Sequence, residues 1–465
     1  MGQVLGTLRA FFIGKKSHTI PPPPKPTPTA EVKGSSSEPE TVAIIGGGIG
    51  GVILAIGLIR RGVPAHIYHG KEAFGEIGAG VTVGPNAVRA LTLNSPDLAT
   101  AFHKHVTCNS DHPKSFLAFR RGVPLSNDDK DGWLFDLSSD ETAPNWTELP
   151  ARMAAHRGRF LDEIVKLLPP DCVSFNKALA NIEEVSSSSS GGNKVKLTFS
   201  DGTSVISGIV IGCDGAHSVA RRFVHGTESV PTFSGEYAYR ALVPADVYVA
   251  KLGRERALNG QLYVGEGGTV TTYPVERGSS INMIALRHLP EDNTNSGWEG
   301  KSWLAPATEA DLRADFVGWD PRLLELLTEY GTGSKWAVFH YLHDLPYFRG
   351  PVCLLGDSAH ATTPNMGAGA GQAMEDAFVL AGLLSELPPT GGDEVRRVFT
   401  AYDAVRRPRA QKVVEWSRLC GMTYTLQDED VGHDFVKMKT ELNRRFRWLL
   451  DADLQAHFDE AKAML

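Results

Sequence analysis

Hydrophobic and polar positions begin to repeat in a regular way just after residue 40. Val42 to Ile45 is a run of apolar strand formers, a cluster of glycines follows, and an apolar stretch then continues to Ile59. A second short strand pattern lies at Ala65 to Tyr68. The order strand, glycine turn, helix and strand is typical of a βαβ unit. We therefore predict that the folded core begins at about Thr41 with an α/β arrangement.

The middle of the chain has the period-two pattern of strands. Ala178 to Val185 and Lys194 to Phe199 alternate between apolar and polar residues, which predicts a hairpin closed by the loop Ser186 to Gly192. Between about Phe223 and Phe348 the sequence is again rich in β-formers, and this region is the candidate substrate domain. Strands are expected at Ile209 to Ile211, Tyr237 to Pro244, Gln261 to Val264, Thr269 to Leu286 and Val352 to Leu355.

The last part of the chain is mainly helical. A helical pattern runs from about Gly371 to Leu384, and helical sequence continues to Leu465. At the other end, the first 40 residues are rich in Pro, Thr and Ser around Pro21 to Pro24, so segment 1–40 is predicted to be disordered. The apolar pattern between Val4 and Ile13 would permit a weak association with a membrane surface, although a frayed terminus is the favoured interpretation.

Composition and charge point to small-molecule partners. The net charge is −7 and no long block of Lys and Arg is present, which argues against a nucleic-acid partner. The stretch Val42 to Ile59 is long enough to be tested as a membrane span, but its clustered glycines favour a strand and a tight turn, so no transmembrane span is predicted. The five cysteines are scattered without a C-x-x-C pair, so we predict no metal site and a reducing, cytoplasmic location.

The first chemical motif is the glycine cluster from Gly46 to Gly51. Glycines at 46, 48 and 51 permit the turn, let the backbone approach a pyrophosphate, and let the helix pack on the strand. A dinucleotide fold usually carries an acidic residue at the end of the second strand for the ribose hydroxyls. His69 occupies that place here, and Glu72 is the nearby alternative.

Two further motifs follow strand ends. Asp214 and Gly215 lie in the segment from Gly212 to Ser218, and Asp357 lies in the segment from Gly356 to His360. An aspartate beside a glycine at a strand end can reach a chain of sugar-like hydroxyls, and a glycine-rich backbone that enters a helix can approach a flavin. In the glycine-rich segment after the Asp357 motif, the candidate cofactor-binding residues are Pro364, Gly367, Ala368, Gly369 and Ala370. No catalytic role is assigned to His360, because a histidine in this motif is more often structural.

This ordered set of motifs resembles the single-component flavin aromatic hydroxylases, and within them the fungal salicylate-hydroxylase-like branch. The matching positions run from about Thr41 to Ala410 and include Gly75 to Val81 and the pair His156 and Arg157. The resemblance implies FAD contacts at Gly48, Arg157 and Asp357, and a dual flavin and nicotinamide role for the Asp214 segment. It also implies that NAD(P)H binds transiently, without a second dinucleotide domain.

A closer likeness concerns the substrate. Tyr239 to Leu242 and Thr272 to Val275 are similar to strands that line the pocket of fungal enzymes that hydroxylate and dearomatise polyketide phenols. By that likeness Arg240 and Tyr273 would hold the substrate phenolate, since a guanidinium and a phenol can stabilise an oxyanion. The alternatives are a surface arginine and a core tyrosine. Asn365, where relatives commonly carry histidine, leaves the substrate preference open.

The resemblance implies an α/β fold with a Rossmann-type FAD-binding domain, an inserted β-sheet substrate domain and C-terminal helices. We predict residues 41–115, 150–224 and 349–400 for the first, 116–149 and 225–348 for the second, and 401–465 for the third. The expected enzyme is an NAD(P)H- and O2-consuming monooxygenase that acts on a salicylate-like or polyketide phenol through a flavin hydroperoxide, with dearomatisation in secondary metabolism as one outcome. The alternatives are epoxidation or ketone oxidation of a non-phenolic substrate, and a non-catalytic binding protein on the same fold.

Overall fold

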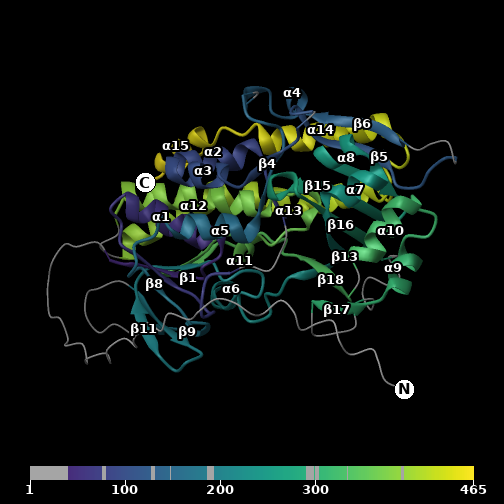
Figure 1. The fold of residues 1–465 in the computed structure, drawn as a ribbon. Helices are drawn as coiled ribbons and strands as arrows, with labels where there is room; N and C mark the ends of the chain where they lie inside the picture. Colours follow the sequence, from purple (N-terminus) through teal and green to yellow (C-terminus); the bar gives the residue numbers. More distant parts are fainter. Residues whose placement is uncertain are drawn as a thin grey trace, which may run out of the picture. The chain divides into compact units, whose positions relative to one another are not determined.

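A computed structural model of the chain describes residues 40–465, apart from 76–79, 111, 127–130, 147, 186–192, 290–297, 299–302, 332 and 389–391. The described residues form four sheets and a set of helices (Figure 1). The two large sheets are a mostly parallel one that carries the glycine motifs and a mostly antiparallel one that carries Arg240 and Tyr273. The predicted α/β fold is confirmed, while the predicted segment 1–40 lies outside the described residues except for Glu40.

The first sheet has six strands and begins the core. Its order is β19 (Phe348–Arg349), β20 (Val352–Leu354), β12 (Val210–Gly212), β1 (Val42–Ile45), β2 (Ala65–Tyr68) and β8 (Val173–Ser174). All neighbours are parallel except β19 and β20. Strands β1 and β12 are fully buried. Parallel strands that are buried on both faces need apolar residues at every position, which explains the short apolar runs in the sequence. The motif residues that follow β1, β12 and β20 therefore meet at one edge of the sheet.

The second sheet has eight strands. Its order is β17 (Leu304–Ala307), β18 (Gly333–His340), β13 (Thr232–Pro244), β16 (Ser280–His288), β15 (Gly268–Val275), β14 (Gln261–Gly265), β5 (Ser115–Arg121) and β6 (Trp133–Ser138). The expected strand from Thr269 to Leu286 is two strands, because the chain turns at Glu276–Gly278, where Arg277 and Gly278 have positive φ. The remaining pairings are antiparallel, apart from β14 with β5.

Two three-stranded sheets complete the strands. One is β11 (Ser204–Ser207), β10 (Lys194–Phe199) and β9 (Leu179–Val185), which contains the predicted antiparallel pair of β9 and β10; its connecting loop lies outside the described residues. The other is β3 (Gly80–Val83), β7 (Met153–His156) and β4 (Val106–Cys108). Strand β7 ends directly at Arg157 and is preceded by Arg152. This small sheet therefore positions an arginine at each end of one strand.

The helices cover the first sheet and extend to the second. They are α1 (Ile49–Arg60), α2 (Pro85–Asn94), α3 (Pro96–His103), α4 (Ser139–Thr142), α5 (Arg157–Val165), α6 (Val219–His225), α7 (Ala245–Leu252), α8 (Arg254–Leu258), α9 (Glu309–Asp315), α10 (Pro321–Tyr330), α11 (Asp357–His360), α12 (Gly369–Glu386), α13 (Gly392–Tyr424), α14 (Phe435–Leu450) and α15 (Leu454–Lys462). Among the residues that the structure describes, no helix is long and apolar enough to cross a membrane.

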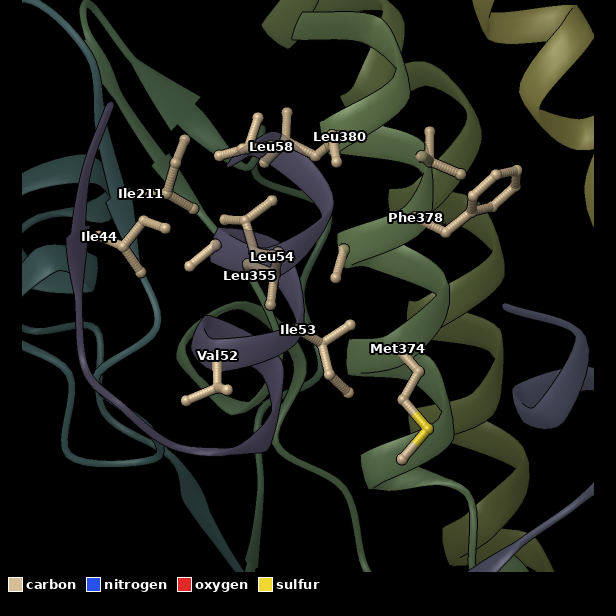
Figure 2. Close-up of a cluster of buried hydrophobic side chains, with 14 of the residues drawn as sticks. Ile44, Val52, Ile53, Leu54, Leu58, Ile211, Leu355, Met374, Phe378 and Leu380 are labelled. Carbon is tan, nitrogen blue, oxygen red and sulfur yellow. The ribbon is translucent and has the colours of Figure 1, made fainter. Parts of the chain in front are cut away.

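The core of the first sheet is built around α1. Figure 2 shows this helix between Ile44 and Ile211 of the sheet on one side and α12, which carries Leu380, on the other. Ile53 and Leu54 of α1 are both fully buried. A helix that is apolar on all sides has to be covered on all sides, which explains why this segment has the hydropathy of a membrane span. The packing fixes the N-termini of α1 and α12 relative to each other.

A buried ion cluster joins α12 to α13. Arg406 Nη1 lies 2.6 Å from Glu375 Oε2, and Arg406 Nε lies 2.7 Å from Asp376 Oδ1. Arg409 contacts Glu375 at 2.7 Å, and His360 Nε2 contacts the second oxygen of Asp376 at 2.6 Å. His360 is therefore a buried partner of a structural carboxylate. The cluster attaches α13 to the helix that follows the Asp357 motif.

Helix α13 links the two large cores. Its first half, including Val398 and Phe399, packs in the core of the six-stranded sheet. Its second half, including Trp416 and Tyr424, packs in a cluster with β5, β6 and α14. The predicted boundary at residue 400 thus falls within a continuous helix.

Candidate active site

A cavity of about 510 Å³ lies between the loops of the six-stranded sheet and one face of the eight-stranded sheet. Gly48 to Gly51, Arg157 and Asp357 line it from the first side, and Arg240 and Tyr273 line it from the second. Tyr424, at the end of α13, also contributes. Segments from nearly the whole described chain therefore meet at one cavity.

The glycine turn from Gly46 to Gly51 has the geometry that the motif predicts. Gly46 has a φ of +109°, and its N–H donates to the Tyr68 carbonyl at 2.9 Å. A Cβ at Gly46 would overlap the Cys213 carbonyl oxygen, and one at Gly51 would overlap the Gly46 carbonyl oxygen. Helix α1 begins after Gly48 without a side-chain cap. The helix N-terminus that lines the cavity is thus suited to an anion such as a phosphate.

His69 supports the glycine turn from behind. Its Nδ1 accepts a hydrogen bond from the Gly47 N–H at 3.1 Å, and its ring stacks on Phe74. Burial lowers the pKa of His69, so the neutral imidazole that this hydrogen bond requires is favoured. Glu72 is exposed and does not line the cavity. A contact of Glu72 with a ribose stays a prediction.

The Asp214 segment faces the cavity with its backbone. Asp214 Oδ1 accepts from the Ser218 hydroxyl at 2.5 Å, and Oδ2 accepts from the N–H groups of Val219 and Ala220 at 2.7 and 3.1 Å. The carboxylate therefore holds the start of α6. Gly215, which has a φ of +79°, lines the cavity, whereas the side chain of Asp214 is absent from its wall.

Asp357 and Arg157 form a charged part of the wall. Asp357 is the first residue of α11 and lies on the cavity side. Burial lowers the pKa of Arg157, and the charge of Asp357 opposes that shift. The two residues that the resemblance assigns to FAD therefore line the same cavity, while their contact with FAD stays a prediction.

The glycine-rich segment after Pro364 enters α12. Pro364 begins a short turn that ends at Gly367, whose φ is +59°. Helix α12 then starts at Gly369 without a side-chain cap. The residues of this segment that line the cavity include Pro364, Gly367, Ala368, Gly369 and Ala370. Two uncapped helix N-termini, those of α1 and α12, thus face one cavity, and they fit the phosphates and polar chain of a dinucleotide.

Arg240 and Tyr273 lie on the opposite wall. Strand side chains alternate, so the residues that share this face are two apart: Ala238 and Arg240 on β13, Thr271 and Tyr273 on β15, and Asn282 and Ile284 on β16. The Arg240 guanidinium lies 5.2 Å from the centre of the Trp336 ring. Tyr273 is buried, and burial raises its pKa while the charge of Arg152 opposes the rise.

Asn365 is joined to a buried carboxylate that the sequence does not reveal. Its Nδ2 donates to both oxygens of Glu236 at 3.2 Å, and Glu236 is 3% exposed. Burial raises the pKa of Glu236 to about 7, although hydrogen bonds from Asn365 and Ser234 oppose the shift. Asn365 lines the cavity, so this acid lies one residue behind the wall.

Glu236→Gln should remove a pH dependence of stability. Because the folded-state pKa of Glu236 is above the ordinary 4.5, its contribution to stability is fully present below pH 4.5 and is lost as the pH rises through about 7. Between these limits the wild type should lose about 3 kcal/mol from this group. Urea unfolding at pH 5 and pH 8 measures the difference. The variant should be the more stable protein at pH 8 only.

The exposed Glu228 offers a matched control. Glu228→Gln should leave the pH dependence of unfolding as it is in the wild type. An identical loss of stability from pH 5 to pH 8 in wild type and Glu236→Gln would contradict the role of Glu236.

Comparisons with known proteins agree with this arrangement. A family model described as an FAD binding domain matches residues 179–417. A 6-methylsalicylate 1-monooxygenase of Aspergillus terreus is 38% identical over 424 residues, which cover 89% of this chain and 90% of that protein. A salicylate hydroxylase of Pseudomonas putida is 33% identical over 439 residues, which cover 91% of this chain and 95% of that protein. Among solved structures, a salicylate hydroxylase in a substrate complex matches with a TM-score of 0.78 and 29% identity, covering 92% of this chain and 98% of that one.

Proposed function

Because the chain belongs to the FAD-dependent monooxygenases that include salicylate hydroxylase, we propose that it hydroxylates a phenolic ring with NAD(P)H and O2. One oxygen atom of O2 forms a bond with a ring carbon, the second leaves as water, and NAD(P)H supplies two electrons. The observation that carries the proposal is the shared cavity: Arg240 and Tyr273 face it from one wall, and the glycine turn and Asp357 face it from the other.

The residues of the first wall fit FAD. The backbone from Gly46 to Gly51 and the N-terminus of α1 would hold its phosphates, and Arg157 and Asp357 would hold polar groups nearer the flavin. The turn is so tightly packed that Cβ atoms at Gly46 and Gly51 would overlap the carbonyl oxygens of Cys213 and Gly46. When bound, FAD would provide the chemistry that activates O2, which protein side chains do not have.

The second wall would activate the substrate. A phenol is more electron-rich at its ring carbons once its hydroxyl is ionised, and a guanidinium favours that ionisation. Arg240 has this chemistry, and stacking on Trp336 restricts its position. Tyr273 can donate a hydrogen bond to the same oxygen. The apolar residues between them would orient the ring and exclude water.

The substrate class is a salicylate-like acid or a polyketide phenol. Relatives named for salicylate and 6-methylsalicylate support the first, and FAD-dependent monooxygenases among the fungal relatives support a place in secondary metabolism. The test measures NAD(P)H oxidation by the holoenzyme with salicylates, resorcinols and acylated phenols, and mass spectrometry detects one added oxygen. Hydroxylated product supports the proposal. An epoxide or ester product, or a lack of stimulation by every phenol, would reject it.

Arg240→Met should lower kcat/KM for the phenol by about a hundredfold, because loss of one oxyanion donor typically has an effect of that size. The pH optimum of the variant should also move upward, since the bound phenol must ionise without the cation. Tyr273→Phe should have a smaller effect in the same direction. Product formation and NAD(P)H oxidation are measured together, so that uncoupled turnover is visible.

Arg287→Met provides the matched control on the same sheet. Arg287 donates to the Glu266 carbonyl and does not line the cavity. The control should keep wild-type turnover and FAD content. Unchanged product formation in both Arg240→Met and Tyr273→Phe would remove these residues from the mechanism.

We also propose the cofactor domain, the substrate domain and the cytoplasmic location predicted from the sequence, without the boundary at residue 400, which falls within α13. The two large sheets support a cofactor domain and a substrate domain. All five cysteines are free thiols, which fits a reducing compartment.

A further inference from the structure

The side-chain amide of Asn365 leaves a hydrogen-bond acceptor open in the cavity wall. Its Nδ2 donates to both oxygens of Glu236 at 3.2 Å and to the Thr363 hydroxyl at 3.3 Å. Its Oδ1 accepts no hydrogen bond from the residues that the structure describes, and those residues do not bury it completely. Because Asn365 lines the cavity, this oxygen is available to a ligand that carries an N–H or O–H donor.

Glu236 determines which end of the amide faces the cavity. An ionised carboxylate only accepts hydrogen bonds, so it attracts the NH2 group of Asn365 and repels Oδ1. Burial raises the pKa of Glu236 to about 7, so most of this carboxyl group is ionised at pH 8. The reverse orientation of the amide would place Oδ1 against the two carboxylate oxygens.

Helix α13 closes this pair from behind. A Cβ at Gly421 would lie 2.4 Å from Asn365 Nδ2 and 2.8 Å from Glu236 Oε1, so only glycine leaves room for the two side chains. One turn earlier, the Ser417 hydroxyl accepts from the Met366 N–H at 3.2 Å. The turn that carries Asn365 is therefore fixed on the side that faces away from the cavity.

The pair lies at one end of the wall that carries Arg240. Side chains alternate along a strand, so Glu236, Ala238 and Arg240 share one face of β13. Glu236 and Arg240 are four residues apart, which is about 13 Å along the strand. Ala238 and its cross-strand neighbour Leu286 line the cavity between them. A cation and an acceptor at the two ends of an apolar stretch suit a ring that has hydroxyl groups on two sides.

We propose that Asn365 Oδ1 accepts a hydrogen bond from a second ring hydroxyl of the substrate, and that Glu236 is the positioning residue that keeps this oxygen turned to the cavity. The proposal rests on the proposed function, in which Arg240 and Tyr273 hold the first hydroxyl as a phenolate. An asparagine that is held in this way accepts a hydrogen bond but does not offer one to the ligand. The wall should therefore select a donor at this point.

Two other roles of Asn365 make different predictions. In a purely structural role, the side chain only closes its turn, and the chemistry of the ligand has no influence. In the other role, the donor is an N–H group of the flavin ring. Phenols that carry either a second hydroxyl or a fluorine at the same ring position distinguish these roles, because fluorine is of similar size and donates no hydrogen bond.

The test is an equilibrium titration of the FAD-loaded, oxidised enzyme at pH 8 without NAD(P)H, followed by flavin absorbance. The three dihydroxybenzenes are compared with the fluorophenols of the same substitution pattern. In the wild type, at least one dihydroxybenzene should bind about tenfold more tightly than its fluorophenol, since one hydrogen bond typically contributes a factor of this size. Asn365→Leu should reduce this ratio to less than about twofold and leave the affinity for the fluorophenol within about threefold.

Glu236→Gln tests the positioning role without changing the acceptor itself. Glutamine can donate to Asn365 Oδ1, so the amide can turn its NH2 group to the cavity. The ratio should then fall to about threefold, with FAD content unchanged. Glu228→Gln, at an exposed position, should keep the wild-type ratio.

Three results would overturn the proposal. The first is equal affinity of the wild type for every dihydroxybenzene and its fluorophenol, which requires no variant to fold. The second is a ratio that stays at tenfold in both Asn365→Leu and Glu236→Gln. The third is a tenfold loss of FAD affinity in Asn365→Leu with an unchanged ligand ratio, which would assign the donor to the flavin.

The outcome is separable from the proposed function, because binding to the oxidised enzyme involves no turnover. If the titrations give the expected ratios and no phenol is hydroxylated, the proposed function is wrong and the acceptor site remains. If phenols are hydroxylated and every wild-type ratio is close to one, the acceptor site is wrong and the proposed function remains.

Discussion

Replacing Arg406 with methionine is expected to lower the free energy of unfolding by about 3–5 kcal/mol, because it leaves two buried carboxylates without their common cation. Arg406, Glu375 and Asp376 are all fully buried. Burial alone would raise the pKa of Glu375, but the charges of Arg409 and Arg406 hold it well below its usual range. Methionine keeps most of the side-chain volume, so the loss measures the charge and not a cavity. Denaturant unfolding gives the value.

Arg396→Met is the control on the same helix. Arg396 and Asp393 form an exposed pair, with side chains 67% and 86% exposed. Solvent screens such pairs, so this substitution should change the free energy of unfolding by less than about 0.5 kcal/mol. A loss below 1 kcal/mol in Arg406→Met would mean that solvent or the neighbouring Arg409 neutralises the cluster without Arg406.

Gly46→Ala is expected to abolish FAD retention and to destabilise the protein by about 3 kcal/mol or more. The left-handed backbone at Gly46 is unfavourable for alanine, and the new Cβ would overlap the Cys213 carbonyl, which cannot move without disrupting β12. The same shift would displace the first turn of α1 from the phosphates. Flavin absorbance of the purified protein and its unfolding free energy are the measurements.

Gly62→Ala separates backbone strain from the overlap. Gly62 follows the other end of α1, has a φ of +77°, and no atom lies within 4 Å of a Cβ built there. This variant should lose about 1 kcal/mol and keep its FAD. A Gly46→Ala protein that retains FAD as well as Gly62→Ala does would show that the cofactor does not depend on the close turn.

The glycine motifs that line one side of the cavity could be predicted because their signals are local. Glycine turns and helix starts are specified by neighbouring residues, so the turn predicted at Gly46 is present, and Gly215 and Gly367 also have positive φ. Local pattern did not reveal that the Asp214 carboxylate is occupied within its own segment. An aspartate at a strand end can turn outward or cap the next helix, and the choice depends on the loop conformation.

The second wall could not be derived from local pattern. Only the resemblance predicts a role for Arg240 and Tyr273, since a strand arginine and a strand tyrosine are common in any sheet. Arg152 is positioned by contacts with Thr82 and Tyr273, which lie far away in the sequence. The pKa of Glu236 likewise depends on burial against Asn365, 129 residues later. Such properties arise only from tertiary packing.

The distribution of the cavity wall along the chain has a consequence for synthesis. The wall begins at Gly48 and is completed at Tyr424, with Arg157 and Tyr273 between them. A ribosome produces these residues in order, and domains fold as their chain becomes available. The glycine turn therefore forms long before the last part of the cavity wall is made. We expect a nascent chain halted before α13, which lacks the helix that packs on the six-stranded sheet, to retain less FAD than the chain that includes it.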